Sequence, residues 1–274
     1  MIDRPAFTVL PPDGPASPIV AHVPHASTVI PAEARARLLL DDAALARERV
    51  RMTDWHTDAL FAWTGRLGAT RFVNGRSRLV VDPERFPDDA EEPMAAIGQG
   101  AVYLRTSDGL PLRAPDEGAR RALLDAYFHP YHAALTALVD EVLLGWGRCL
   151  IVDCHSFPTD PMPSEQDQAP ARPDICIGTD AFHTPWWLAG ALRASMAGAG
   201  FRVEVDRPFA GTIVPLAYYR RDPRVASVMI EVRRGLYCDE ATGERRPDFA
   251  SVARRLEGAV GRALAAGSMG QLAT

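Results

Sequence analysis

The 274-residue sequence lacks several features that would mark a membrane, secreted or nucleic-acid-binding protein. It has no apolar run of about 18 residues, so we expect no membrane span. The N-terminal stretch MIDRPAFTVLPPDGP lacks the charged-then-apolar pattern of a signal peptide. The net charge is −5 at pH 7, whereas phosphate binding needs a basic face. We therefore expect a cytoplasmic protein that binds neither membranes nor nucleic acid.

Cysteine is scarce in the sequence, which has only Cys149, Cys154, Cys176 and Cys238. None of them forms a C-x-x-C pair, and three lie in apolar runs typical of strands. We interpret them as buried, reduced thiols rather than as a disulfide framework. With 47% hydrophobic residues, a chain of this length can bury a sizeable core without disulfides.

Short runs rich in β-branched residues predict strands at 18–25, 68–75, 78–82, 149–155, 174–179, 201–206 and 225–232. Helices are expected at 42–63, at 116–145 with a kink at Pro130, at 184–198 with Thr184 as N-cap, and at 248–266. Alternating strands and helices predict an α/β fold, a three-layer sandwich with a mixed, mostly parallel sheet flanked by helices. The proline- and acid-rich segment 158–174 reads as a long loop over a site, so we expect a single domain over 1–274.

Three of the predicted strands carry side chains that can bind a metal or move a proton. His25 and His155 stand at strand ends, Glu231 lies within VMIEV, and the segment RMTDWHTD adds Asp54 and Asp58. Ligands of open α/β sheets bind beyond the carboxyl ends of strands. A catalytic zinc ion takes three protein ligands and keeps one position open. The residues therefore indicate a zinc site on His25, His155 and one of the two acids, with Glu231 as the base that activates water.

Each of these residues also has a structural interpretation. A strand-end histidine is often a satisfied core residue, and Asp54 could cap a helix. Glu231 is costly to bury without a partner, and Arg233 or Arg234 could pair with it. Three further histidines are expected in packing roles rather than as ligands: His22, His129 and His132.

The ordered set of motifs resembles the N-formylglutamate amidohydrolase family. The matching stretches run from residue 18 to about 240: VPHASTVIP, MTDWHTDALF, SRLVVDPERFPDD, FHPYHAAL, LIVDCHSFP, DICIGTD, RPFAGTIV and SVMIEVRRGLYCDE. The resemblance implies a zinc-carboxypeptidase-like fold with one catalytic zinc. It implies hydrolysis of N-formyl-L-glutamate to formate and L-glutamate, a late step in histidine degradation. It also implies His25, Asp54 and His155 as zinc ligands, which favours Asp54 over Asp58, and Glu231 as the base.

Two stretches depart from the family pattern. The common PHSG is PHAS here, and a DLNRPP-like run is DPERFPDD, with Glu84 in place of asparagine while Arg85 remains. These differences affect substrate recognition more than the metal site.

A substrate with carboxylates calls for arginines, which clamp a carboxylate through two hydrogen bonds. We favour Arg78 and Arg85, although many of the 30 basic residues must be surface charges. Gly211 and Thr212 are expected to form a wall of the pocket. Asp153 precedes His155 by two residues, so on a strand it faces the same way and can orient the imidazole.

Two rival functions remain at this stage. The first is a related zinc amidohydrolase or carboxypeptidase-like enzyme that acts on another small N-acyl amino acid. The second is a non-catalytic binding protein on the same fold. A Ser-His-Asp hydrolase is disfavoured because the chain has no G-x-S-x-G motif.

Overall fold

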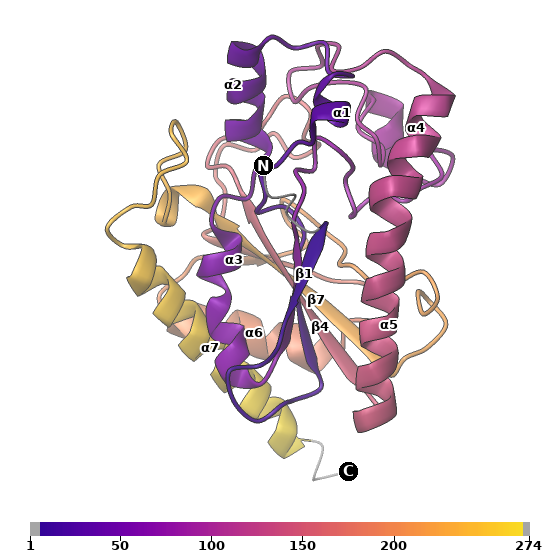
Figure 1. Ribbon diagram of the computed structural model, residues 1–274. Coiled ribbons are helices and arrows are strands. Elements are labelled where there is room, and N and C mark those ends of the chain that lie inside the picture. The colour runs from indigo at the N-terminus through magenta and orange to yellow at the C-terminus, as the bar shows by residue number, and fades with distance from the viewer. Residues whose placement is uncertain (1–5, 271–274) are drawn as a thin grey trace.

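The computed structural model describes residues 6–270 and has a seven-stranded sheet at its centre (Figure 1). The strands in sheet order are β1 (Phe7–Leu10), β3 (Thr70–Asn74), β2 (Ile19–Val23), β4 (Cys149–Phe157), β7 (Val225–Arg233), β5 (Ile175–Gly178) and β6 (Val203–Val205). Strands β3, β2, β4 and β7 run parallel to one another. The edge strand β1 is antiparallel to β3, and β5 and β6, which are parallel to each other, are antiparallel to β7. The mixed, mostly parallel sheet predicted from the sequence is confirmed.

Helices occur on both faces of the sheet and beyond one of its ends. The α-helices are α1 (Ala32–Arg35), α2 (Asp42–Met52), α3 (Thr57–Leu60), α4 (Glu117–Leu123), α5 (His129–Trp146), α6 (Trp186–Gly198) and α7 (Phe249–Gly270). Short 3₁₀ helices cover Ala62–Leu67, Pro93–Ile97 and Arg234–Leu236, and a π-helical turn covers Leu124–Phe128. Helices α1, α2 and α4 lie together beyond the upper end of the sheet in Figure 1.

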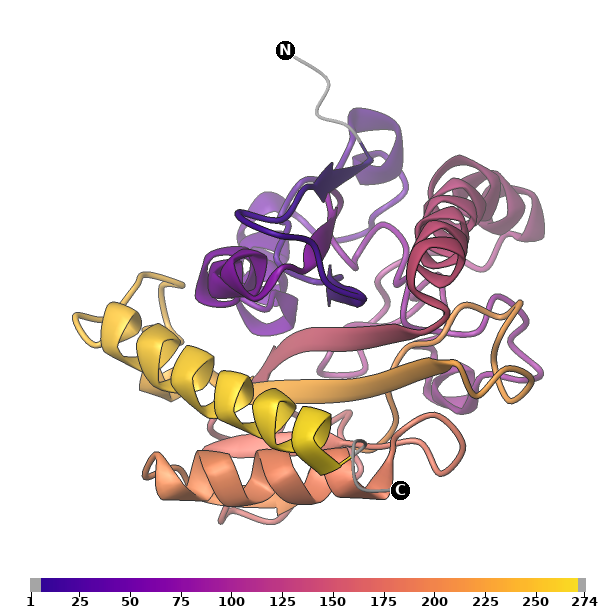
Figure 2. The ribbon, with the colours of Figure 1, turned by 90° about the horizontal axis from the view of Figure 1, so that it is seen from below.

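The two faces of the sheet bury different sets of side chains. The sheet is therefore the middle of three layers, with helices packed on each side. Ile151 of β4 packs in a cluster with Leu135 and Val139 of α5. Val152, the next residue of β4, lies in the opposite cluster with side chains of α6 and α7. Figure 2 shows α5 on one side of the long central strands and α6 and α7 on the other. Because side chains alternate along a strand, Asp153 and His155 lie on the α5 face with Ile151.

Several local expectations were wrong. No strand forms at 78–82 in the described chain; the segment runs through turns, and Val80 and Val81 pack with Ala34 and Leu123 instead of on the sheet. A buried apolar run therefore does not by itself distinguish a strand from a packed loop. The edge strand β1 was not predicted.

The helix expected at 42–63 breaks after Met52. Thr53 is extended, and His56 has a left-handed φ of 61° before α3 begins at Thr57. The backbone N–H of Asp54 donates to the carbonyl of His25 at 3.1 Å, so the break joins this segment to the end of β2. The break is therefore what carries Asp54 to the sheet.

The other two helix details also differ from expectation. Thr184 does not cap α6 within the described structure; its hydroxyl donates to the carbonyl of Ser227, and Pro185 stands at the N-cap. Pro130 lies in the first turn of α5, directly after the π-helical turn, so the irregularity precedes the proline.

All four cysteines are buried free thiols, as predicted. Within residues 6–270, no helix is both long enough and apolar enough to cross a bilayer.

Candidate metal centre and active site

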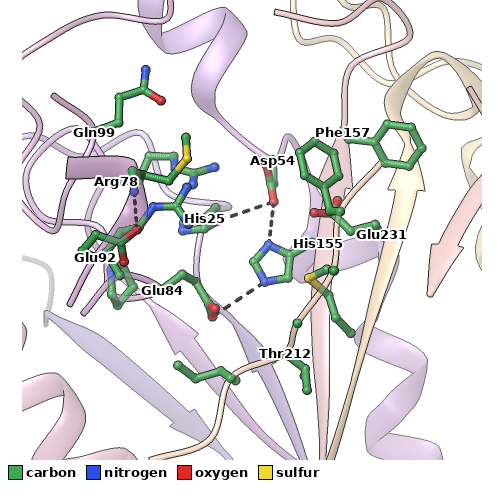
Figure 3. Close-up of a pocket in the computed structure, with 18 of the residues that line it drawn as sticks. His25, Asp54, Arg78, Glu84, Glu92, Gln99, His155, Phe157, Thr212 and Glu231 are labelled. Carbon is green, nitrogen blue, oxygen red and sulfur yellow. Dashed lines mark hydrogen bonds and ion pairs between the residues drawn. The ribbon is translucent and has the colours of Figure 1, made fainter. Parts of the chain in front are cut away.

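A cavity of about 510 Å³ opens at the carboxyl ends of β4 and β7, on the face that α5 covers. Its lining includes His25, Asp54, His155 and Glu231, which come from four separate parts of the chain (Figure 3). Residues of the 158–174 loop also line it, as expected for a loop over a site. Gly211 and Thr212 lie in the wall, where the Thr212 hydroxyl is 2.7 Å from that of Ser227.

The two imidazoles and the Asp54 carboxylate meet at the floor of this cavity. Asp54 Oδ2 is 3.3 Å from His155 Nδ1 and 3.7 Å from His25 Nδ1. One ligand atom from each of the three residues lies within 4.8 Å of the other two. The backbone N–H of Ser156 donates to Asp54 Oδ2 at 3.1 Å and fixes the carboxylate. The structure thus brings together the three residues proposed as ligands.

The Nε2–H group of each imidazole donates a hydrogen bond to a buried carboxylate. His155 Nε2 is 2.9 Å from Asp153 Oδ1, the contact expected from their spacing on β4. His25 Nε2 is 2.8 Å from Asp82 Oδ1. Metal-binding histidines commonly donate their second N–H to a carboxylate, which fixes the ring and its tautomer. The two Nδ1 atoms are therefore the ones left to face Asp54.

Asp82 was not assigned a role from the sequence, although it lies in the segment SRLVVDPER. Arg78 donates two hydrogen bonds to Asp82 Oδ2, at 2.7 and 3.2 Å, and Tyr103 donates a third. Burial alone would raise the pKa of Asp82, but Arg78 and His25 hold it well below its usual value. Asp82 is thus a charged acceptor for His25.

The donor set fits a divalent metal ion. His25 Nδ1 is buried and has no hydrogen-bond partner among the described residues, and the nearest charged group to Asp54 Oδ1 beyond the cluster is Arg234 at 3.6 Å. Buried polar atoms are normally hydrogen-bonded, so the unsatisfied Nδ1 beside the Asp54 carboxylate indicates a bound group. Two imidazoles and one carboxylate with an open side form a typical catalytic zinc set. Asp58 is exposed and accepts from the N–H of Ala59, away from the cluster.

Glu231 stands beside this cluster as the ladder partner of His155 on the parallel strands β4 and β7. Its side chain is buried, and Oε2 has no hydrogen-bond partner within the described chain. Burial raises the pKa of Glu231 to about 8, and the negative charge of Asp54 adds to this effect. The structural alternative of an ion pair is not favoured, because Arg233 pairs with Asp174 and Arg234 faces Asp54 Oδ1 at 3.6 Å.

The two arginines proposed for substrate binding have different surroundings. Arg78 lines the cavity, but its guanidinium donates hydrogen bonds to Asp82 and Tyr103. Arg85 also lines the cavity and approaches Asp82 only to 3.9 Å. Arg85 Nε has no hydrogen-bond partner among the residues that the structure describes. Arg85 is therefore better placed than Arg78 to receive a carboxylate.

A second cluster lies behind His155, where His22, Glu84 and Asp153 have ligand-type atoms within 4.8 Å of one another. His22 is fully buried, with Nδ1 at 2.9 Å from Asp153 and Nε2 at 2.6 Å from the Tyr131 hydroxyl. Burial would lower the pKa of His22, but its hydrogen bonds to the two acids raise it to about 9. His22 is thus a core residue, as expected. His132 also packs, with Nε2 at 2.9 Å from a backbone carbonyl.

Solved structures with similar folds include two bacterial proteins. The N-formylglutamate amidohydrolase of Ralstonia eutropha JMP134 aligns with a TM-score of 0.82 and 26% identity, covering 94% of this chain and 97% of that one. The gene product Atu2144 of Agrobacterium tumefaciens aligns with a TM-score of 0.65 and 22% identity, covering 96% of each chain. The second likeness supports the fold alone. The predicted likeness to zinc carboxypeptidases stays a prediction.

Curated relatives share most of the length of this chain. N-formylglutamate deformylase of Pseudomonas aeruginosa PAO1 is 29% identical over 245 residues, which cover 86% of this chain and 88% of the relative. N-formylglutamate deformylase of Pseudomonas putida is 27% identical over 230 residues, covering 81% and 82%. Together with the fold, these relatives define a hydrolase that acts on an amide bond. The family model of N-formylglutamate amidohydrolase matches residues 17–238, so the chain belongs to that family.

Proposed function

We propose that this chain hydrolyses N-formylglutamate to formate and glutamate, with one zinc ion held by His25, Asp54 and His155. The observation that carries the proposal is the approach of both Nδ1 atoms to Asp54 Oδ2, at 3.3 and 3.7 Å, beside the buried Glu231. The relatives named N-formylglutamate deformylase support the choice of substrate. When bound, the metal would polarise the formyl carbonyl and lower the pKa of water.

Glu231 acts as the proton carrier. Its carboxylate accepts a proton from the attacking water and then returns that proton to the leaving nitrogen. A pKa raised by burial suits this role, because it brings proton uptake close to neutral pH. Asp82 and Asp153 hold the two imidazoles by hydrogen bonds of 2.8 and 2.9 Å, so the site is arranged before substrate arrives.

Arg85 binds a carboxylate of the substrate. Its guanidinium lines the cavity, while Arg78 is occupied with Asp82 and acts on His25 through that acid. Gly211 and Thr212 form the facing wall and limit the space for the acyl group. Arg78 is thus a positioning residue in this proposal, and Arg85 is the clamp.

Formate release from N-formyl-L-glutamate by purified, zinc-loaded protein tests the proposal. We expect turnover that a chelator abolishes and added zinc restores. Asp54→Asn should lose both metal and activity, because an amide is a poor replacement for an anionic ligand. Asp58→Asn is the matched control and should keep both. Zinc-loaded protein that releases no formate, or an Asp54→Asn variant with full metal content, would contradict the proposal.

A further inference from the structure

One buried ion pair of the 158–174 loop has no part in the proposed hydrolysis. Glu165 lines the cavity and pairs with Arg172, which is not among the described lining residues. Only 7% of the Glu165 side chain and 2% of the Arg172 side chain are exposed. Glu165 therefore lies between the cavity and a buried positive charge.

Arg172 is fixed in place beside the end of β4. Its guanidinium carbon lies 5.6 Å from the ring centre of Phe157 and 5.7 Å from that of Phe209, two rings that line the cavity. Its Nη1 donates to the carbonyl of Pro158 at 3.1 Å, and its own carbonyl accepts from Arg202 at 3.1 Å. Aromatic rings stabilise a guanidinium most strongly when it is desolvated. These contacts would keep Arg172 in position if Glu165 moved away.

Glu165 is held less firmly than its partner. Its Oε2 accepts from Arg172, whereas its Oε1 is buried without a hydrogen-bond partner in the described chain. Burial raises the pKa of Glu165, although Arg172 acts in the opposite direction. The turn that carries Glu165 is closed by local hydrogen bonds to the carbonyl of Met162, from the N–H of Glu165 and from Gln168, both at 2.9 Å. The Glu165 carboxylate can therefore leave Arg172 without disturbing the sheet.

N-formylglutamate has two carboxylates, whereas the described lining offers Arg85 for one of them. The other two arginines of the lining are engaged, Arg78 by Asp82 and Arg234 by the carbonyl of Arg51. Burying a carboxylate without a cation is costly. The second carboxylate of the substrate therefore needs a further positive group close to the cavity.

Arg85 and Arg172 lie on different sides of the proposed metal site. Arg85 approaches Asp82 to 3.9 Å, on the side where Figure 3 shows Arg78. Figure 3 shows Phe157, which contacts Arg172, on the opposite side of the cluster. A substrate whose two carboxylates bind these arginines would lie across the cluster. Arg172 lies behind the lining, so it suits the side-chain carboxylate, which is farther from the scissile amide than the α-carboxylate is.

We propose that Arg172 binds the side-chain carboxylate of the substrate, and that Glu165 occupies this position until the substrate replaces it. This inference rests on the proposed hydrolysis of N-formylglutamate and assigns its second carboxylate. The exchange replaces one ion pair by another, so the buried guanidinium is not left without an anion. A neutral carboxamide cannot replace Glu165 in this way. The ion pair thus makes the cavity select substrates with a charged side chain.

The first test compares kcat/KM for N-formyl-L-glutamate and N-formyl-L-glutamine in wild type, Glu165→Gln and Asp160→Asn. Asp160 is an exposed acid of the same loop outside the described lining, so its variant removes one charge without touching the ion pair. An amide competes poorly for a guanidinium, so the preference for the glutamate compound should rise about tenfold in Glu165→Gln. It should stay unchanged in Asp160→Asn. A preference that Glu165→Gln leaves at the wild-type value overturns the inference.

Arg172 is tested in the Glu165→Gln background, where its loss leaves no buried acid unpaired. The double variant with Arg172→Gln should lose the gain, and its preference for the glutamate compound should fall about tenfold or more below the wild-type value. Thermal melting and metal content verify that each variant is folded and loaded. A gain that persists without Arg172 would mean that Glu165 acts only through its charge, and the inference would be wrong.

A structural measurement decides the matter if a variant does not fold, or if the wild type hydrolyses neither compound. The latter result would end the proposed function but not the proposed role of Arg172. Crystals of wild-type protein soaked with N-acetyl-L-glutamate should show its side-chain carboxylate on the Arg172 guanidinium, with Glu165 displaced. A ligand carboxylate bound elsewhere, or Glu165 still paired with Arg172 in the soaked crystals, overturns the inference.

Discussion

His155 and Glu231 are paired across the parallel strands β4 and β7, the two longest strands that the structure describes. The pairing holds a candidate metal ligand and a candidate base side by side on one face of the sheet. Backbone hydrogen bonds along both strands fix this relation, so it does not depend on a flexible loop. A functional group on a rigid strand is held more precisely than one on a loop.

Replacing Glu231 by glutamine should separate proton transfer from metal binding. The amide cannot accept a proton from water, and general-base catalysis contributes about 10²–10⁴-fold. We expect kcat to fall by about this factor while metal content stays at the wild-type value. Steady-state kinetics and elemental analysis of the same sample check both. A variant with near-normal kcat would remove Glu231 from the role of base.

Asp82→Asn should weaken metal binding although Asp82 touches no metal. It removes the charged acceptor that holds His25 Nε2 at 2.8 Å. Loss of such a partner typically costs about 10–100-fold in metal affinity. Competition with a chromophoric chelator measures the affinity. Asp88→Asn, a change at an exposed acid in the same segment, is the control and should bind metal normally. Equal affinity in the two variants would show that Asp82 has no such role.

Arg85→Lys should raise KM much more than it lowers kcat. Lysine cannot form the two parallel hydrogen bonds that arginine gives a carboxylate. A hydrogen bond to a charged group contributes about 1.5–3 kcal/mol, so KM should rise by about 10–100-fold. Arg121→Lys, at an exposed position of α4, is the control. An unchanged KM in Arg85→Lys would leave the carboxylate clamp to another residue.

Two leucines of α5 offer a matched test of the core. Leu135 is fully buried against the sheet, whereas Leu144 is 90% exposed on the same helix. Leu135→Ala should lower the free energy of unfolding by about 2–5 kcal/mol, since it leaves a cavity. Leu144→Ala should change it by no more than about 0.5 kcal/mol. Urea unfolding curves measure both. Similar losses at the two positions would mean that α5 does not pack as described.

Much of the sheet could be predicted because its central strands are buried on both faces. LIVDCH and SVMIEV are continuous apolar runs, and each ends in polar residues at the carboxyl end of a strand. The structure brings His25 and His155 together at this edge of the sheet, and their role as metal ligands stays a prediction. The predicted spacing of Asp153 and His155 also holds, because alternation along β4 is fixed by the backbone.

The residues that were missed lie where the chain leaves regular structure. The apolar run before Asp82 predicts a strand, but its residues pack in a loop against α1 and α4. The sequence around Thr53 contains no proline or glycine, so no local signal predicts that the helix ends there. Its cause is tertiary: the backbone of Asp54 hydrogen-bonds to His25, a residue 29 positions earlier in the chain (54 − 25). Such long-range contacts are not visible in local sequence patterns.

The most direct test of the account is the position of the metal in crystals of zinc-loaded protein, measured by anomalous scattering at the zinc edge. We predict one peak bonded to His25 Nδ1, His155 Nδ1 and a carboxylate oxygen of Asp54, at about 2.0–2.2 Å from each. Glu231 should lie beside the open coordination position. An anomalous peak among His22, Glu84 and Asp153 would contradict the account. Active, zinc-loaded protein that shows no anomalous peak at His25 and His155 would also contradict it.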